Sequence, residues 1–148
     1  MLCKVHALRL SQEEVYSYFV SNQEIFIPPL SDRVNLKEYS AKLVAYSTHF
    51  CVFTGKELTG FAAGYFNHPK REMSFLSTLS VVKEFQNKGI GSELLRTVIN
   101  YGTSKGFDEL RLIVYDANTD AVKLYTRTGF VETGRLLDKT EMVLRLKK

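Results

Sequence analysis

The 148-residue sequence is poor in cysteine and proline and contains no tryptophan. Its two cysteines, Cys3 and Cys51, have no short metal-binding or redox spacing, so neither a zinc site nor a disulfide framework is indicated. The longest apolar runs are far shorter than the roughly 20 residues needed to cross a bilayer. The N-terminus alternates apolar and polar residues, unlike a signal peptide. These absences predict a cytoplasmic protein with no bound metal and no membrane span.

No long glycine-, serine- or charge-rich stretch divides the chain, so we expect one domain over residues 1–148. The net charge is +4, with a surplus of one basic residue over residues 1–82 and of three over residues 83–148. This charge is too small to indicate a nucleic-acid partner, which usually needs a concentrated basic face. Its bias suits a phosphorylated ligand bound by the second half.

The most informative stretch is the loop at residues 86–91, between a predicted apolar strand and an amphipathic helix. A helix start has unpaired backbone N–H groups and positive partial charge, which suits phosphate. Gly89 and Gly91 allow close backbone approach, and Lys88 adds a cation. The loop contains no G-x-x-x-x-G-K-[ST] motif, and Leu94 replaces the third glycine of the Rossmann motif. Taken alone, an ordinary tight turn explains the loop equally well.

Hydrophobic periodicity, caps and turn residues predict the element order β-α-α-β-β-β-α-β-α-β-β. The predicted helices begin at about residues 11, 35, 91 and 118. Residues 110–114 are expected to form a buried strand, and four residues of the second helix are expected to share one face: Leu36, Tyr39, Leu43 and Tyr46. The other predicted strands cover residues 2–10, 50–54, 58–66, 73–82, 130–136 and 141–146. The fold class is α/β (α+β), with a mixed, mostly antiparallel sheet of about seven strands flanked by about four helices.

Three motifs follow one another along the chain: L-x-V at residues 79–81, Q-x-x-G-x-G at residues 86–91, and N-x-x-A-x-x-L-Y-x-x-x-G-F at residues 118–130. Their order resembles that of the GNAT acetyltransferase superfamily, which transfers acyl groups from coenzyme A to amines. The predicted element order coincides with the GNAT order, so pattern and motifs agree. The resemblance implies a single GNAT-like domain.

Within that domain, the resemblance implies three parts. Residues 1–72 form the half that faces the acceptor, residues 73–130 form the acyl-CoA-binding core, and residues 131–148 supply the last strands. The resemblance leaves open whether the protein is a homodimer.

The resemblance also implies roles for individual residues. Backbone groups of Leu79 and Val81 pair with the pantetheine arm of acetyl-CoA, and the Leu79 N–H faces the thioester carbonyl. Tyr125 protonates the departing thiolate, while Asn118 caps a helix and contacts the cofactor. The pyrophosphate is bound by the loop residues Gln86, Asn87, Lys88, Gly89, Ile90 and Gly91. Ordinary packing is the alternative for Leu79, Val81 and Tyr125.

The general base is not identified by the sequence. Histone-type members of the superfamily carry a glutamate on the central strand where this chain has Phe75, and a phenyl ring accepts no proton. A water relay, an acceptor amine that binds already deprotonated, or a side chain from the first half remain as alternatives; the side chains are Asp32, Glu38, Tyr65 and His68. The histidines His6, His49 and His68 are otherwise expected to have surface or packing roles.

The predicted function is an N-acetyltransferase that uses acetyl-CoA and an unidentified amine. A non-catalytic acyl-CoA sensor is the main alternative, because of Phe75, and a nucleic-acid-modifying acyltransferase is the second. Five residues could line the acceptor cleft or simply fill the core: Phe26, Pro28, Pro29, Tyr39 and Tyr46.

Overall fold

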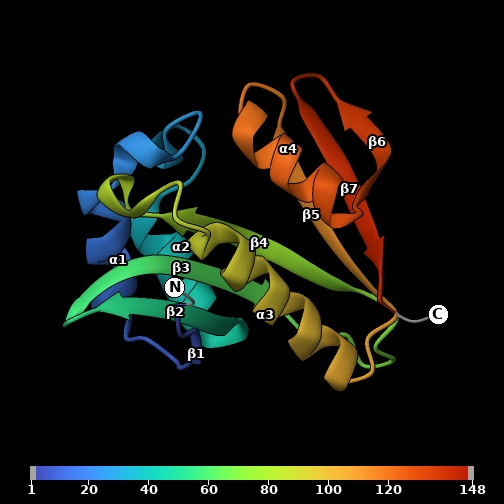
Figure 1. The fold of residues 1–148 in the computed structure, drawn as a ribbon, viewed down its shortest axis with the longest axis horizontal. Helices are drawn as coiled ribbons and strands as arrows, with labels where there is room; N and C mark the ends of the chain where they lie inside the picture. The colour runs from blue at the N-terminus through green and yellow to red at the C-terminus, as the bar shows by residue number, and fades with distance from the viewer. Residues whose placement is uncertain (1–2, 147–148) are drawn as a thin grey trace.

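The computed structural model describes residues 3–146 (Figure 1). Within this range the chain forms one seven-stranded sheet with the strand order β1-β2-β3-β4-β5-β7-β6, together with four α-helices. The strands are β1 (His6–Ala7), β2 (Thr48–Thr54), β3 (Glu57–Tyr65), β4 (Ser74–Val81), β5 (Glu109–Tyr115), β6 (Val131–Leu136) and β7 (Lys139–Arg145). The helices are α1 (Gln12–Ser21), α2 (Leu36–Tyr46), α3 (Ile90–Ser104) and α4 (Thr119–Thr128), with short 3₁₀ turns η1 (Gln23–Ile25), η2 (Leu30–Asp32) and η3 (Lys83–Phe85). The predicted fold class and element order are confirmed.

Side-chain caps fix the starts of three of the helices. Ser11 and Glu14 form a reciprocal capping box at the start of α1. The Asn35 side chain accepts a hydrogen bond from the Glu38 N–H at α2, and Asn118 accepts one from the Ala121 N–H at α4. These caps were visible in the sequence because each depends on residues three positions apart.

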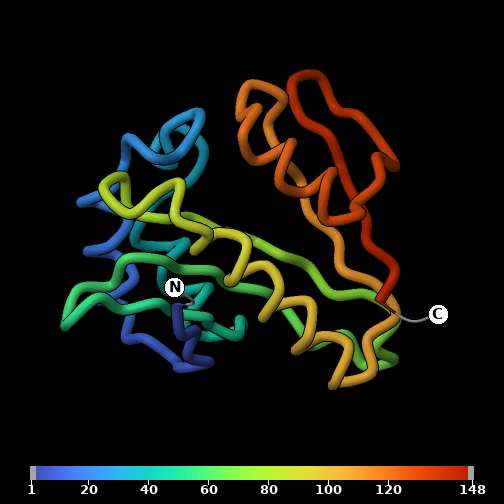
Figure 2. Tube along the Cα trace, viewed as in Figure 1, coloured from blue at the N-terminus to red at the C-terminus, as the bar shows by residue number. Residues whose placement is uncertain are grey.

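The sheet divides in its middle. Strands β4 and β5 run parallel and pair only at Ser74–Leu110 and Phe75–Arg111, whereas the other neighbouring strands are antiparallel. Ser77 is a bulge, since Thr78 pairs with Ala63 and Leu76 pairs with Gly64. Beyond the two paired positions the strands separate into a V, and α4, β6 and β7 lie on the far arm (Figures 1 and 2). One edge of β4 therefore has no strand beside it.

Two buried clusters pack against the sheet, one on each face, and the first continues onto the far arm through Tyr125 and Phe130. On one face α3 packs Leu94, Leu95 and Val98 against Phe50 and other strand residues. On the other face the α1 and α2 side chains, Phe19 and Leu43 among them, pack against Phe61 and Cys51. Cys51 is fully buried in this cluster, and burial raises its pKa to about 12.

Three local expectations were wrong. Strand β1 covers only His6–Ala7, because the Leu10 N–H leaves the ladder and donates to Nδ1 of His49; position 2 of the expected strand lies outside the described residues. Tyr46 is 65% exposed, because it is the last residue of α2 and the chain then turns into β2. Ile113 of β5 is 45% exposed, because β4 has already diverged from β5 at that level.

Candidate active site

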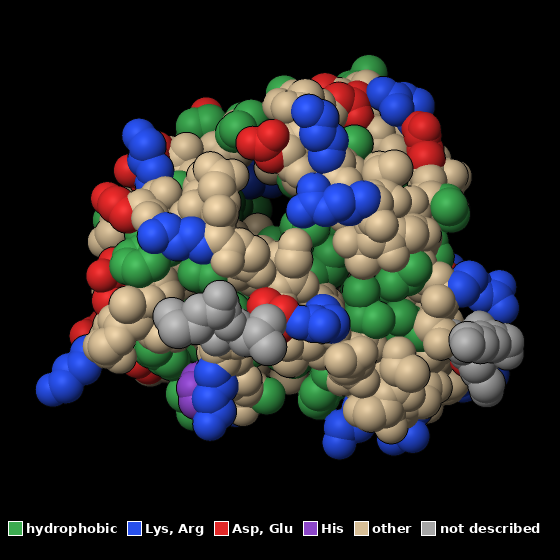
Figure 3. Space-filling view, in the orientation of Figure 1, with side chains coloured by type: hydrophobic (Ala, Val, Ile, Leu, Met, Phe, Trp, Pro, Cys, Tyr) green, Lys and Arg blue, Asp and Glu red, His purple; other side chains and the backbone are tan. Residues whose placement is uncertain are grey.

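A cleft of about 480 Å³ lies between β4, the loop before α3, and α4. In Figure 3 the surface is hollowed between the two arms, and Lys and Arg side chains stand at the rim. Nine residues with sequence-predicted roles line this cleft: Leu79, Val81, Gln86, Asn87, Gly89, Ile90, Gly91, Asn118 and Tyr125. The structure thus brings together residues from all three motifs. We call this space the donor cleft.

The start of α3 opens into the donor cleft without a side-chain cap. Its N-cap is Gly89, at a φ of +85°, and the Glu93 N–H is the first to find an intrahelical acceptor, the Gly89 carbonyl. The N–H groups of Ile90 and Gly91 have no partner among residues 3–146. A Cβ built on Gly89 would meet no atom within 4 Å. The end of α3 that carries positive partial charge is therefore open to an anion.

Two residues of the loop, Gln86 and Lys88, are less available than their neighbours to contact a ligand in the donor cleft. The Gln86 N–H already donates to the Lys83 carbonyl, and its side-chain amide donates to the Val81 carbonyl at 3.0 Å. Lys88 is exposed, does not line the cleft, and has its Nζ 6.0 Å from the Phe85 ring centroid. The backbone N–H groups of the other loop positions, 87–91, have no such partner in the described part of the chain.

Three cations that the motif reading missed line the donor cleft: Lys83, Lys123 and Arg127. Arg127 reaches from α4 to the start of α3, where its Nη2 lies 3.5 Å from the Ser92 hydroxyl oxygen. The only sequence signal for these side chains was the basic surplus of residues 83–148. Glu24 and Asp120 also line the cleft, so the three cations leave a small positive surplus, which favours a polyphosphate.

Tyr125 lies where the V of the sheet opens. It is buried, its ring lies edge-on to Phe130 at 5.6 Å, and the Phe130 N–H donates to the Tyr125 carbonyl. Gly129 makes this possible, because it ends α4 at a φ of +114°. Burial raises the pKa of Tyr125, and its hydroxyl has no hydrogen-bond partner within the described residues. The G-F of the third motif therefore fixes the position of a protonated phenol.

A second cleft of about 320 Å³ adjoins the first on the side of α2 and η2. It is lined by β4 and β5 side chains, including Phe75, Ser77 and Ile113, and by Phe26 and Tyr39 from the first half. The Tyr39 hydroxyl lies 2.6 Å from the hydroxyl of Ser77, the bulged residue of β4. Leu79 and Tyr125 line both clefts, so the two spaces meet there; the other shared lining residues are Ile25, Ile27, Asn118 and Ala121. We call the second space the acceptor cleft.

The residues considered for a general base lie outside this junction. Asp32, Glu38, Tyr65 and His68 line neither cleft, and His68 instead pairs with Glu72 at 3.9 Å. Pro28, Pro29 and Tyr46 do not line the acceptor cleft either, although Phe26 and Tyr39 do. Phe75 lies on the central strand β4, as expected, and its side chain lines the acceptor cleft.

His49 has the packing role that the sequence predicts. Its Nδ1 accepts from the Leu10 N–H, so Nε2 carries the proton and donates to the Leu43 carbonyl at 3.1 Å. Burial lowers the pKa of this imidazole. Residues 3–146 contain no cluster of His, Cys, Asp or Glu that could hold a metal ion, and no helix among them is long and apolar enough to cross a membrane.

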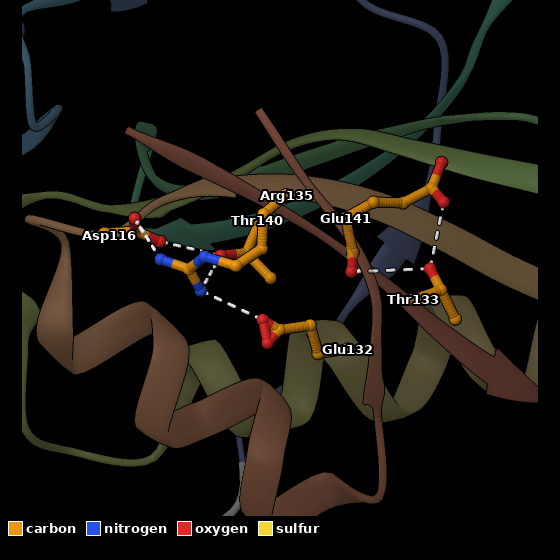
Figure 4. Close-up of polar contacts among 6 residues, drawn as sticks. All are labelled: Asp116, Glu132, Thr133, Arg135, Thr140 and Glu141. Carbon is orange, nitrogen blue, oxygen red and sulfur yellow. Dashed lines mark hydrogen bonds and ion pairs between the residues drawn. The ribbon is translucent and has the colours of Figure 1, made fainter. Parts of the chain in front are cut away.

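A polar network braces the loop that leads into α4 (Figure 4). Arg135 of β6 donates to Asp116 at 2.7 Å and to Glu132 at 2.9 Å, and Thr140 of β7 donates to Asp116 at 2.7 Å. The Asp116 N–H donates to the Asp138 carbonyl. Because Asp116 lies two residues before the Asn118 cap, the hairpin β6–β7 fixes the end of α4 that faces the clefts.

Comparison with known proteins places this geometry in a family. The sequence profile of the acetyltransferase (GNAT) family matches residues 13–130. Bovine thialysine N-epsilon-acetyltransferase is 32% identical over 77 residues, which are 51% of this chain and 45% of that enzyme. Aminoglycoside N(6')-acetyltransferase type 1 of Salmonella typhimurium is 32% identical over 63 residues, 43% of this chain and 43% of that enzyme. The chain spans less than half the length of these two relatives.

Solved structures share the whole fold. PaiA N-acetyltransferase of Thermoplasma acidophilum, in complex with coenzyme A, aligns with a TM-score of 0.76 and 18% identity over 96% of this chain and 99% of that chain. The ribosomal-protein-S18-alanine N-acetyltransferase of Escherichia coli aligns with a TM-score of 0.79 and 19% identity over 99% of this chain and 96% of that chain. The splayed sheet and its helices are thus a GNAT fold. With the profile match over most of its length, the chain belongs to the GNAT acetyltransferase family.

Proposed function

We propose that this protein transfers an acetyl group from acetyl-CoA to a primary amine of a small molecule or a peptide, by direct attack in a ternary complex. The observation that carries the proposal is the junction of two clefts at Leu79 and Tyr125. A donor and an acceptor that each fill one cleft would meet at these two residues. Family membership supports the same reaction.

The donor cleft fits the phosphates and pantetheine of acetyl-CoA. The free N–H groups of Ile90 and Gly91 would bind the pyrophosphate, and the open space above Gly89 lets phosphate approach the backbone. Asn87, Lys88 and Asn118 would assist at the edges of this site, while the paired Gln86 would order the loop. The backbone groups of Leu79 and the N–H of Val81 on the unpaired edge of β4 would pair with the pantetheine arm as a strand does, while the Val81 carbonyl already accepts from the Gln86 side chain.

At the junction, the Leu79 N–H would donate to the thioester carbonyl and stabilise the charge that develops on its oxygen. Tyr125 would donate its proton to the leaving sulfur. Burial keeps the phenol protonated, because it raises the pKa of Tyr125. The same burial would raise the pKa of a thiol held beside it, so transfer of the proton stays feasible.

The acceptor cleft offers no side-chain base: none of its described lining residues is Asp, Glu or His. We therefore propose that the amine reaches Leu79 as the free base, or loses its proton to water. Neither route requires a proton-accepting side chain at the position of Phe75.

The test is release of free thiol from acetyl-CoA in the presence of a panel of amines, with mass spectrometry of the acetylated product. Thiol release that depends on the amine supports the proposal. Tight coenzyme A binding without thiol release from any amine would favour the sensor instead. Failure to bind coenzyme A would overturn both. The cytoplasmic location remains a prediction from the sequence, and a homodimer remains open.

A further inference from the structure

The acceptor cleft contains two cations and no carboxylate. Arg33, which follows η2, and Lys139, the first residue of β7, both line it. Every other lining residue is apolar or uncharged, and the described lining includes neither Asp nor Glu. The charge inside this cleft is therefore positive, although the first half of the chain as a whole is nearly neutral.

The two cations converge on one ring. The Arg33 guanidinium carbon lies 4.8 Å from the centroid of the Tyr115 ring, and the Lys139 Nζ lies 5.2 Å from the same centroid. Cation–π attraction holds each charge there, while the two charges repel one another. An anion bound beside Tyr115 would remove that repulsion.

Neither cation has an acidic partner among residues 3–146. The ion pairs of this region use Arg135, Asp116 and Glu132 instead. Asp116, the chain neighbour of Tyr115, has both carboxylate oxygens engaged, by Arg135 and by Thr140. Arg33 and Lys139 thus remain available to a ligand.

The charge of Arg33 also acts on Tyr39. Burial raises the pKa of Tyr39 to about 12, and the hydrogen bond with Ser77 and, to a smaller extent, the charge of Arg33 oppose that rise. Tyr39 in turn is hydrogen-bonded to Ser77, two residues before Leu79. The positive charge therefore acts on the wall along which an acceptor would approach the junction.

We propose that the acceptor is an amine that carries an anionic group, a carboxylate or a phosphate, on an apolar body. The anion binds Arg33 and Lys139 beside Tyr115, the body lies against Phe75 and Ile113, and the amine points to Leu79 and Tyr125. This substrate class rests on the acetyl transfer proposed above. It disfavours polyamine-like acceptors, whose second charge would face two cations.

One scaffold with three charges tests the proposal. Para-(aminomethyl)benzoate, para-(aminomethyl)benzamide and para-xylylenediamine carry the same amine and differ at the far end in being anionic, neutral and cationic. The matching phosphonate separates a phosphate preference from a carboxylate preference, and leucine with leucinamide covers an anion next to the amine. Thiol release gives kcat/KM for each, corrected for the fraction of free amine. Calorimetry on the protein saturated with coenzyme A measures binding without turnover.

We expect an anionic probe to exceed its neutral partner in kcat/KM by roughly tenfold or more, the usual worth of a charge-assisted contact. Arg33→Gln combined with Lys139→Gln should remove that preference and leave the neutral probe and the KM for acetyl-CoA nearly unchanged. Lys105→Gln is the matched control, because Lys105 also lies over a tyrosine ring, that of Tyr101 at 5.5 Å, but outside both clefts.

Equal or better use of the neutral or cationic probes would overturn the proposal while leaving acetyl transfer intact. A preference that survives the double variant would overturn the assignment to Arg33 and Lys139. If no amine releases thiol, preferential binding of an anionic probe by the wild type and its loss in the double variant would still support the substrate class. Equal binding of all probes, or none, would reject it.

Discussion

The donor and acceptor clefts are built by different means, although they share one wall at Leu79. The donor cleft presents backbone groups, at the uncapped start of α3 and along the free edge of β4. The acceptor cleft presents side chains brought together from distant segments, with Arg33 and Lys139 meeting at Tyr115. Backbone recognition needs glycine and a fixed local geometry, so it leaves a motif in the sequence. Side-chain recognition depends on tertiary packing and leaves none.

The two helix starts beside the donor cleft show the same contrast between backbone groups and side chains. Helix α4 begins with a side-chain cap at Asn118, while α3 begins at Gly89 with none. A cap would satisfy the N–H groups that an anion needs. The missing cap at α3 is therefore the feature that separates a ligand-binding helix start from a structural one.

The largest expected effect tests the junction of the clefts. Tyr125→Phe should lower kcat by roughly 10²- to 10⁴-fold, the usual range for a positioned acid. Coenzyme A affinity should stay nearly constant, because the aromatic contact with Phe130 is retained. Single-turnover thiol release and calorimetric titration measure the two quantities.

Tyr101→Phe is the control for this prediction, because Tyr101 lies on α3 outside both clefts. An unchanged kcat for Tyr125→Phe, where chemistry limits turnover, would exclude Tyr125 as the acid. A loss of coenzyme A affinity alone would make it a packing residue.

Local signals explain what could be predicted from the sequence. Caps at Ser11, Asn35 and Asn118 and the stop at Gly129 all depend on nearby residues, and the structure has each of them in place. The loop at residues 86–91 was visible for the same reason. These local signals predicted the helix starts and the loop before α3, but not Lys83, Lys123 and Arg127, which the fold brings to the same cleft.

Long-range contacts explain what could not. The His49 imidazole takes the N–H of Leu10 and shortens β1, although the alternation of residues 2–10 is typical of a longer strand. The bulge at Ser77 and the meeting of Arg33 with Lys139 depend on how segments far apart in sequence pack. No periodicity in the chain reports such contacts.

The next expected effect tests backbone recognition. Gly89→Val should reduce coenzyme A affinity by roughly 100-fold or more, since a branched side chain would stand where phosphate approaches and the backbone would leave its left-handed geometry. In the unliganded protein the new side chain has open space, so its cost to folding is the φ strain of about 1–2 kcal/mol.

Gly106→Val gives the matched control for that strain. Gly106 has a φ of +83° and likewise no neighbour within 4 Å of a built Cβ, but it lies at the other end of α3. Both variants should lose similar thermal stability, and only Gly89→Val should lose coenzyme A in calorimetry. Equal affinities for Gly89→Val and the wild type would remove the loop from the donor site.

A smaller effect tests the acceptor side through pH. Because the described acceptor cleft has no carboxylate or imidazole, kcat/KM should rise about tenfold per pH unit until the amine itself is deprotonated. Tyr39 stays neutral over this range, since burial raises its pKa to about 12. The apparent pKa should follow the intrinsic pKa of each acceptor. A value near neutrality that is the same for all acceptors and disappears in His68→Gln or Asp32→Asn would instead identify a protein base.

The smallest expected effect tests whether the hairpin β6–β7 positions the junction. Arg135→Gln removes the bonds to Asp116 and Glu132 at the exposed end of the network in Figure 4, and such pairs contribute little to stability. Because Asp116 leads into the Asn118 cap, α4 should shift slightly and carry Tyr125 away from Leu79. We expect kcat to fall roughly two- to fivefold, with Arg135→Lys restoring part of the loss.

The control is Arg96→Gln, which breaks a comparable exposed pair with Glu93 inside α3 and should leave kcat unchanged. If Arg135→Gln lowers the melting temperature but not kcat, the hairpin stabilises the far arm without positioning Tyr125.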